Sequence, residues 1–198
     1  MKTRINRALF KIKQFNKIAE IDEIARRYLA MNSFDGVLAI LGILLASFFA
    51  DIQSRSTVIT ASLGIAVAIA VSGFYGTFIT EKAERTRKIK KLEKSVGMFL
   101  KESQIQSAHS FATFALAAID GLSPFLIAII IIMPFFITSS MALAYYLSFA
   151  LAVLFLFLVG AFLGTISKEN VFKEGMKMIA AGIVCTIIIF FVEKFAGV

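Results

Sequence analysis

Long apolar segments without charge alternate with short charged segments along this chain. Residues 56–80 contain no charged side chain, and residues 103–167 contain a single one, Asp120. Residues 28–50 likewise contain a single charged side chain, that of Asp35. Because a helix of about 20 apolar residues crosses the hydrocarbon core of a bilayer, the pattern predicts membrane-spanning helices. The five that we expect lie near residues 28–50, 56–80, 108–135, 141–166 and 176–196.

The apolar stretch 103–167 is long enough for two of these helices, and its break is predicted at Pro134 and the polar residues 138–140. The last apolar stretch, 178–192, is short for a span. Lys177 and Lys194 at its two ends can extend their side chains to the membrane surfaces, so we count it as the fifth helix.

The composition agrees with this pattern. Of 198 residues, 59% are hydrophobic and 17% charged, whereas soluble domains average roughly half apolar and a quarter charged. Such a chain is not disordered, and its single cysteine, Cys185, excludes an internal disulfide framework. We therefore expect an all-α polytopic membrane protein. Its surroundings would be the lipid bilayer of the cell membrane, or of an internal vacuole-type membrane if the source is eukaryotic.

The positive charge is distributed unevenly. The chain carries a net charge of +8, and 19 of its 21 Lys and Arg residues lie in 1–27, 81–109 and 167–177. The positive-inside rule assigns these segments to the cytoplasmic side, which predicts a cytoplasmic N-terminus and a C-terminus outside. That arrangement requires an odd number of spans. The charge is thus an orientation signal, and we expect no nucleic-acid partner.

Two basic segments have further predicted roles. Residues 1–27 carry apolar side chains at helical spacing among Lys and Arg. This predicts a cytoplasmic amphipathic helix that lies on the membrane surface or packs on the cytoplasmic loops. The basic cytoplasmic link 81–107 should begin as an extension of the second helix, and its excess of basic residues favours contact with anionic lipid. Its carboxylates, with Met98 and His109 nearby in sequence, are alternative metal ligands.

Two pairs of helices share sequence features, which indicates a two-helix internal repeat. Asp-Gly pairs occur in the first span at 35–36 and in the third at 120–121. The second and fourth spans end in similar segments, GFYGTFITEK at 73–82 and GAFLGTISKE at 160–169. Membrane transporters often contain such repeats.

Asp35 and Asp120 are the only acidic residues inside the long apolar stretches 28–50, 56–80, 103–167 and 178–192. An ionisable side chain at membrane depth is costly and usually faces a cavity, a partner helix or an ion path. Met31 and Asn32 precede Asp35 by four and three positions, so they share its helix face. Carboxylate, amide and thioether groups together predict a loose divalent-cation site. A buried carboxylate can also take up a proton in place of the cation.

Other roles fit the same two residues. Asp35 follows several residues that favour helix caps, so it could simply start the first span at the membrane interface. Asp120 could serve as an internal hydrogen-bond partner that fixes helix packing.

Small residues and one proline predict where helices pack or bend. Pro124 interrupts the third span four residues after Asp120, and it lacks the N–H that would bond the carbonyl of Asp120. Small residues spaced about four apart let helices approach closely. The positions with this predicted packing role are Gly36, Gly73, Gly76, Gly160 and Gly164.

The sequence carries no catalytic signature. The motifs HExxH and GxSxG and the phosphate-binding P-loop are absent, and the Asp-Gly pair at 35–36 lacks the further residues of the CDP-alcohol phosphotransferase signature. We therefore expect no enzymatic activity and no cofactor, and a bound metal ion would be a transported substrate.

Four segments of the chain resemble the vacuolar iron transporter family. They run in order from about residue 28 to residue 195, and the resemblance implies the same five-helix topology. The likeness is greatest to short archaeal members that lack the family's cytoplasmic metal-binding domain between the second and third helices. The four segments are FDGVLAILGILLASF, SGFYGTFIT, GLSPFL and LVGAFLGTISKENVFKEGMKMIAAGIV.

This resemblance implies a homodimer that exports or sequesters ferrous iron, and in some members manganese, in exchange for protons. It also implies a place for Asp35 in the translocation path. The family pattern at the end of the second helix includes a Met and a Glu that bind metal, and this chain has Gly73 and Thr77 there. Asp120 is not part of the family pattern, and we expect it to compensate for the missing carboxylate.

The two replacements at Gly73 and Thr77 leave a second interpretation open. The chain would then be a relative with the family's fold that transports another solute. It could equally be a non-transporting membrane scaffold that uses its basic tail and link.

Overall fold

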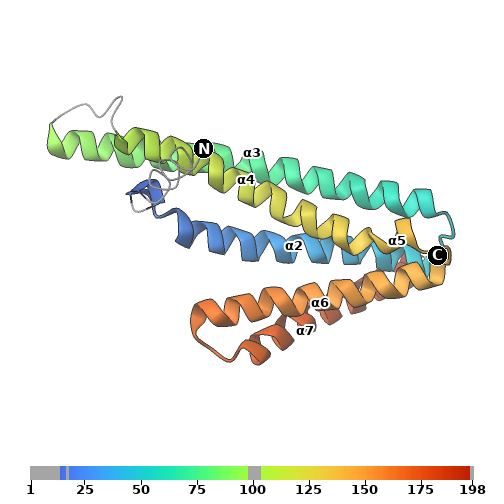
Figure 1. The fold of residues 1–198 in the computed structure, drawn as a ribbon. Coiled ribbons are helices and arrows are strands. Elements are labelled where there is room, and N and C mark those ends of the chain that lie inside the picture. The colour runs from blue at the N-terminus through green and yellow to red at the C-terminus, as the bar shows by residue number, and fades with distance from the viewer. Residues whose placement is uncertain (1–13, 17, 98–103, 197–198) are drawn as a thin grey trace, which may run out of the picture. The chain divides into compact units, whose positions relative to one another are not determined.

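The computed structural model describes residues 14–16, 18–97 and 104–196, and this part of the chain is almost entirely helical (Figure 1). No strand occurs among these residues, which confirms the all-α fold class. The helices are α2 (Ile21–Phe49), α3 (Arg55–Val96), α4 (Gln104–Ile132), α5 (Pro134–Ile137), α6 (Met141–Ser167) and α7 (Val171–Ala196).

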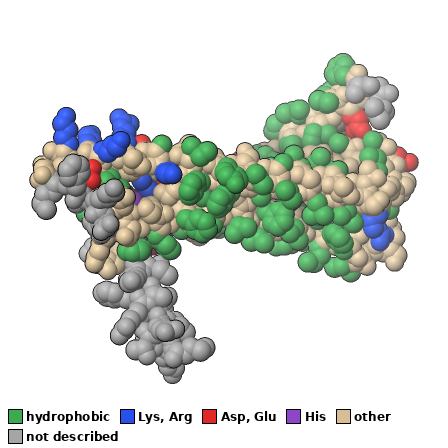
Figure 2. Space-filling view, turned by 90° about the horizontal axis from the view of Figure 1, so that it is seen from above, with side chains coloured by type: hydrophobic (Ala, Val, Ile, Leu, Met, Phe, Trp, Pro, Cys, Tyr) green, Lys and Arg blue, Asp and Glu red, His purple; other side chains and the backbone are tan. Residues whose placement is uncertain are grey.

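Within the described ranges, five helical segments are long and apolar enough to cross a membrane, as expected. α4 and the short α5 together form one of them, Gln104–Ile137. Many large apolar side chains remain exposed along these helices (Figure 2), and only 11% of the most apolar window of α7 is buried within the chain. Helices with such extensive apolar surface are stable in lipid rather than in water. The chain is therefore a multi-pass membrane protein.

α3 is longer than the span predicted within it. The uncharged residues end at Thr80, yet the helix continues to Val96. The Glu, Lys, Arg and Ala residues of this continuation favour helix, and Glu81 and Arg85 form an ion pair one turn apart, with 2.8 Å between Oε2 and Nε. The first part of the basic link 81–107 is therefore a helical extension of α3.

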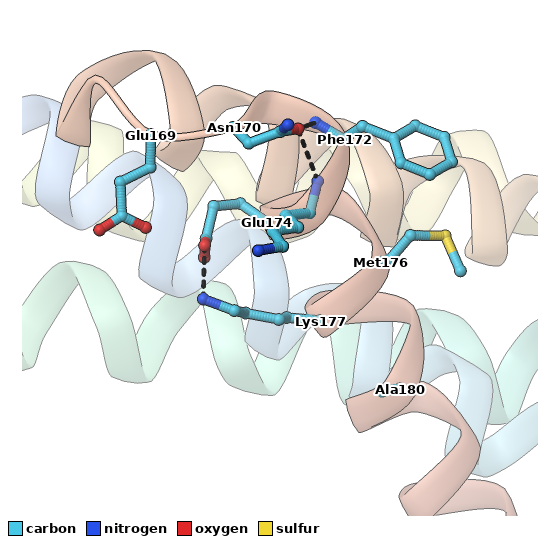
Figure 3. A pocket seen from close by; sticks show the side chains of 8 residues that line it. Glu169, Asn170, Phe172, Glu174, Met176, Lys177 and Ala180 are labelled. Carbon is cyan, nitrogen blue, oxygen red and sulfur yellow. Dashed lines mark hydrogen bonds and ion pairs between the residues drawn. The ribbon is translucent and has the colours of Figure 1, made fainter.

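Local chemistry sets the limits of other helices. Asp51, two residues after the end of α2, adopts a left-handed backbone conformation, φ 48°. Asn170 caps α7, because its Oδ1 atom accepts hydrogen bonds from the N–H groups of Phe172 and Lys173 at 3.0 and 3.1 Å (Figure 3). α7 therefore begins at Val171, several residues before the predicted span 176–196.

Much of the amphipathic helix predicted over residues 1–27 lies outside the described residues. In the described part, Glu20 has a left-handed conformation, φ 52°, and the Asn16 side chain accepts a hydrogen bond from the N–H of Asp22 at 2.8 Å. Residues from Ile21 onward belong to α2. The helix that contains Asp35 thus starts seven positions earlier than the predicted span.

The chain divides into two compact units, each with an apolar core. The first unit comprises residues 1–29 and 71–121, and the second comprises residues 30–70 and 122–198. α2, α3 and α4 contribute residues to both. The buried core of the first unit includes Ala19, Ile21, Ala112 and Leu116. That of the second includes Ile40, Leu44, Ile131, Ile132, Phe135 and Leu156.

α6 and α7 lie side by side as a hairpin in the second unit (Figure 1). A β-carbon at position 164 would lie 2.8 Å from the Cα atom of Val171, and one at position 160 would lie 2.7 Å from the Cα atom of Gly175. Only glycine fits at such distances without a shift of the backbone. Gly160 and Gly164 therefore allow the two helices to pack closely, an arrangement that is favourable in lipid.

Candidate functional site

Asp120 on α4 is a buried carboxylate, 5% exposed, that faces α3. Its Oδ2 atom accepts a hydrogen bond of 2.5 Å from the Thr77 hydroxyl. Thr77 is itself buried. The hydrogen bond joins two helices of the first unit through a carboxylate that burial would otherwise strongly disfavour.

Gly73 lies one turn before Thr77 and faces the same aspartate. A β-carbon at position 73 would lie 3.2 Å from the carbonyl oxygen of Asp120 and 3.3 Å from its Oδ2 atom. A side chain longer than that of alanine would therefore displace Asp120 or its carboxylate. The absence of a side chain at position 73 is what lets the backbone and carboxylate of Asp120 lie against α3.

The same face of α3 continues with two further polar side chains. Thr77, Glu81 and Arg85 follow one another at intervals of four residues, which places them along one side of the helix. We call these three residues the polar face of α3. The Tyr28 hydroxyl of α2 donates a hydrogen bond of 3.0 Å to Glu81, so this face also contacts α2 within the first unit.

Arg85 is 5% exposed and is held by three groups. Its Nε atom lies 2.8 Å from Glu81. Its Nη1 atom lies 3.0 Å from Nδ1 of His109 and 3.3 Å from the carbonyl oxygen of Ala19. A buried guanidinium with a carboxylate and neutral acceptors around it is well compensated. The ion pair with Arg85 also neutralises the charge of Glu81. Glu81 is therefore a weaker cation ligand than Asp120.

Asp120 and Thr77 together offer the kind of oxygen atoms that bind divalent cations. The carboxylate supplies charge, and the hydroxyl oxygen can turn a lone pair toward a cation. In the described part of the chain, no three His, Cys, Asp or Glu side chains gather as a metal cluster.

The other predicted ligands lie in the second unit. Asp35 and Met31 are exposed on α2, and Asn32 is half-buried. The helical spacing keeps these three side chains near one another on α2. Asp35 and Asp120 belong to different units.

The predicted packing residues take different positions. Gly36 is buried against α4, where a β-carbon would lie 2.7 Å from the Cα atom of Pro124. Gly76, in contrast, has no atom within 4 Å of the place where its β-carbon would lie. Gly36 and Pro124 thus form one contact between α2 and α4 within the second unit, and Gly76 lies on the chain's surface.

Tyr28 and Arg85 were not among the residues predicted for the site. Both are ordinary surface residues by type, and Arg85 stands within a run of basic residues. The spacing of 73, 77, 81 and 85 by four residues is the signal that could have identified Arg85, because it marks one face of a helix. Tyr28 lies on α2 and has no such signal.

A pocket at the α6–α7 turn contains carboxylates but does not present a metal-ligand set (Figure 3). Glu174 forms an ion pair of 2.5 Å with Lys177, and Lys173 also lines the pocket. The positive charges of Lys173 and Lys177 would oppose the binding of a cation beside Glu169 and Glu174. Among the described residues, the buried carboxylate of Asp120 on α4 is therefore a better candidate for a cation position than this pocket.

Comparison with known proteins gives two matches. The model of the VIT family matches residues 86–194. An uncharacterised protein of Methanocaldococcus jannaschii is 36% identical over 177 residues, which cover 87% of this chain and 90% of that protein. No solved structure matches the chain.

The family match takes in the end of α3 and nearly all of α4 to α7, including Asp120. Asp35 and Thr77 precede the matched range, whereas the similarity to the archaeal protein extends over most of the chain. The resemblance to vacuolar iron transporters is thereby confirmed. Members of this family are membrane transporters of metal ions rather than enzymes. The chain belongs to the VIT family.

Proposed function

We propose that this chain transports divalent metal ions across the membrane, with ferrous iron and manganese as substrates and protons as counter-ions. Membership of the VIT family supports a role in metal-ion transport. The observation that carries the proposal for this chain is the buried carboxylate of Asp120, which contacts both Gly73 and Thr77. These are the two positions at which the family resemblance implies a Met and a Glu ligand.

Asp120 would bind the cation and the proton in turn. A carboxylate in an apolar environment is stabilised either by a cation or by protonation. When the cation arrives, the Thr77 hydroxyl would turn its hydrogen away and contribute a lone pair. When the cation leaves, a proton would take its place, and the hydrogen bond with Thr77 would satisfy the protonated group. Proton and metal ion would therefore exclude each other at the same oxygen atoms.

The polar face of α3 leads from Asp120 toward the C-terminal end of the helix. Glu81 and Arg85 follow Thr77 at intervals of four residues, or about 6 Å along the helix axis. With the orientation predicted from the Lys and Arg residues, this end is cytoplasmic. Cations would approach Asp120 from that side.

Asp35 would act in a homodimer. It is exposed on a helix that is long and apolar enough to span the membrane, and a carboxylate facing lipid is costly. A second copy of the chain would cover it and bring two Asp35 side chains, with Met31 and Asn32, to the interface. This arrangement would place a second cation position on the translocation path in the cell membrane.

Flux measurements on proteoliposomes test the proposal. Vesicles that contain a metal-sensitive dye should report entry of iron or manganese across a proton gradient, and Asp120→Asn and Asp35→Asn should each abolish it. Asp51→Asn is the matched control, because Asp51 is an exposed aspartate in the turn after α2. It should leave the flux unchanged.

Two results would contradict the proposal. Absence of flux with iron, manganese, cobalt and zinc would favour transport of another solute or a role as a scaffold. Flux that persists in Asp120→Asn would show that the ions do not use the α4 carboxylate.

A further inference from the structure

A pocket of about 280 Å³ lies between α3 and α4 in the first unit, at the point where the uncharged part of α3 ends. Its lining begins with Phe78 and continues past Lys82 and Arg85 on α3, and it includes His109 and Ser110 on α4. No aspartate or glutamate lines it. The pocket is therefore positively charged, unlike the cation-binding position proposed at Asp120.

The two basic side chains that line the pocket, Lys82 and Arg85, differ in exposure and in their number of partners. Arg85 is fixed by Glu81, His109 and the carbonyl of Ala19. Glu81 offsets part of its charge. Lys82 is exposed, with its Nζ atom 5.9 Å from the centre of the Phe78 ring. Lys82 is thus an exposed cation at the pocket, whereas Arg85 is a buried and tightly bonded part of its lining.

His109 adds a neutral donor. A guanidinium nitrogen can only donate, so Nδ1 of His109 must accept the hydrogen bond from Arg85. The hydrogen of the neutral imidazole is then on Nε2, which becomes a donor. The exposed hydroxyl of Ser110 provides another. A cation together with neutral donors is suited to the oxygen atoms of a phosphate group.

The surroundings of the pocket are apolar. Phe78 and Ile89 form part of its lining, and Ile79 and Phe114 are exposed large apolar side chains on the same two helices. Figure 2 shows Lys and Arg side chains gathered over the C-terminal part of α3, with hydrophobic side chains on the adjoining surface. A ligand for this place should combine a negative headgroup with apolar chains.

We propose that the pocket binds the phosphate headgroup of an anionic membrane lipid. Basic pockets between membrane-spanning helices on the cytoplasmic side are suited to such headgroups. The change from uncharged to charged residues near Thr80 places the pocket at the level where a bilayer has its headgroups. Lys82 closes over the phosphate, and the acyl chains lie along the apolar surfaces of α3 and α4. This site does not depend on metal transport.

Lipid retention by the purified full-length chain tests the site. The protein, in a neutral detergent, is titrated with phosphatidylglycerol or phosphatidylcholine, and bound lipid is counted by native mass spectrometry. The wild type should retain one phosphatidylglycerol per site in preference to phosphatidylcholine. Because one charge-assisted hydrogen bond is lost, Lys82→Ala should weaken this retention roughly tenfold. Ser110→Ala should weaken it by about threefold.

Lys91→Ala is the matched control. Lys91 is exposed on the same helical extension, but it lies nine positions from Lys82 and so on the opposite side of the helix. It should retain phosphatidylglycerol like the wild type. Circular dichroism and gel filtration confirm that each variant is folded.

Three results would overturn the assignment. Equal retention of the two lipids by the wild type would remove the headgroup preference. Equal losses in Lys82→Ala and Lys91→Ala would show diffuse attraction to the basic extension instead of a site. Displacement of phosphatidylglycerol by millimolar inorganic phosphate would identify the ligand as a soluble phosphate.

Discussion

Pro124 of α4 lies directly against Gly36 of α2, with its Cα atom 2.7 Å from the place that a β-carbon at position 36 would take. The contact is between backbones, so neither side can yield by rotating a side chain. The two helices approach one another closely here because position 36 has no side chain.

Gly36→Ala should therefore destabilise the protein. The added methyl group must push α2 away from α4, and overpacking of this kind costs about 1–3 kcal/mol. Gly42→Ala on the same helix is the control, because its β-carbon would meet the Ile189 side chain at an ordinary 3.6 Å. Thermal unfolding in detergent should give a lower midpoint for Gly36→Ala and an equal or higher one for Gly42→Ala. Equal midpoints for the two variants would contradict the close contact.

Thr77→Val should lower stability by about 1–2 kcal/mol, since the hydroxyl that donates to the carboxylate of Asp120 is lost while the shape of the side chain is kept. Thr77→Ser should retain most of the stability. A double-mutant cycle with Asp120→Asn isolates the interaction. A coupling energy near zero would mean that the two side chains do not depend on each other.

Arg85→Met and Glu81→Gln should each be strongly destabilising, by about 3–5 kcal/mol, because each leaves the partner charge buried and uncompensated. The double variant, with both charges removed, should be more stable than Arg85→Met alone. Thermal unfolding in detergent, compared among the two single variants and the double variant, is the measurement. Additive losses in the double variant would show that the ion pair makes no difference to either residue.

Asn170→Ala should weaken the start of α7, because two backbone N–H groups lose their acceptor. The expected loss is about 1 kcal/mol. Asn170→Asp keeps an acceptor oxygen and should remain close to the wild type. Hydrogen exchange at Phe172 and Lys173 is the direct measurement, and unchanged exchange in Asn170→Ala would argue against the cap.

The spans were predictable because a charged side chain is so costly in lipid that its absence over 20 residues marks a helix. The extension of α3 beyond Thr80 was predictable only in outline. Its charged residues exclude it from the hydrocarbon core but favour helix on their own, so the end at Val96 depends on local propensity. Charge therefore locates the spans well and the helix ends less well.

The neighbours of Asp120 were harder to foresee. Its depth in α4 follows from its position in the sequence, whereas its contacts depend on how α3 is rotated about its own axis. A rotation of one residue, about 100°, would turn Thr77 and Gly73 away from it. The rotation of α3 is determined by its packing against the other helices of the first unit, and a single sequence does not reveal this packing. Asp35, for which the family resemblance implies a place in the translocation path, lies exposed on the isolated chain.

α3 contains 42 residues, which extend about 63 Å at 1.5 Å per residue, or about twice the thickness of the hydrocarbon core. The part of α3 beyond Thr80 therefore projects well out of the bilayer. When such a helix tilts, its outer end moves farther than the part within the bilayer. A molecule that restrains the outer end consequently limits the tilt of the entire helix, and with it the position of Thr77.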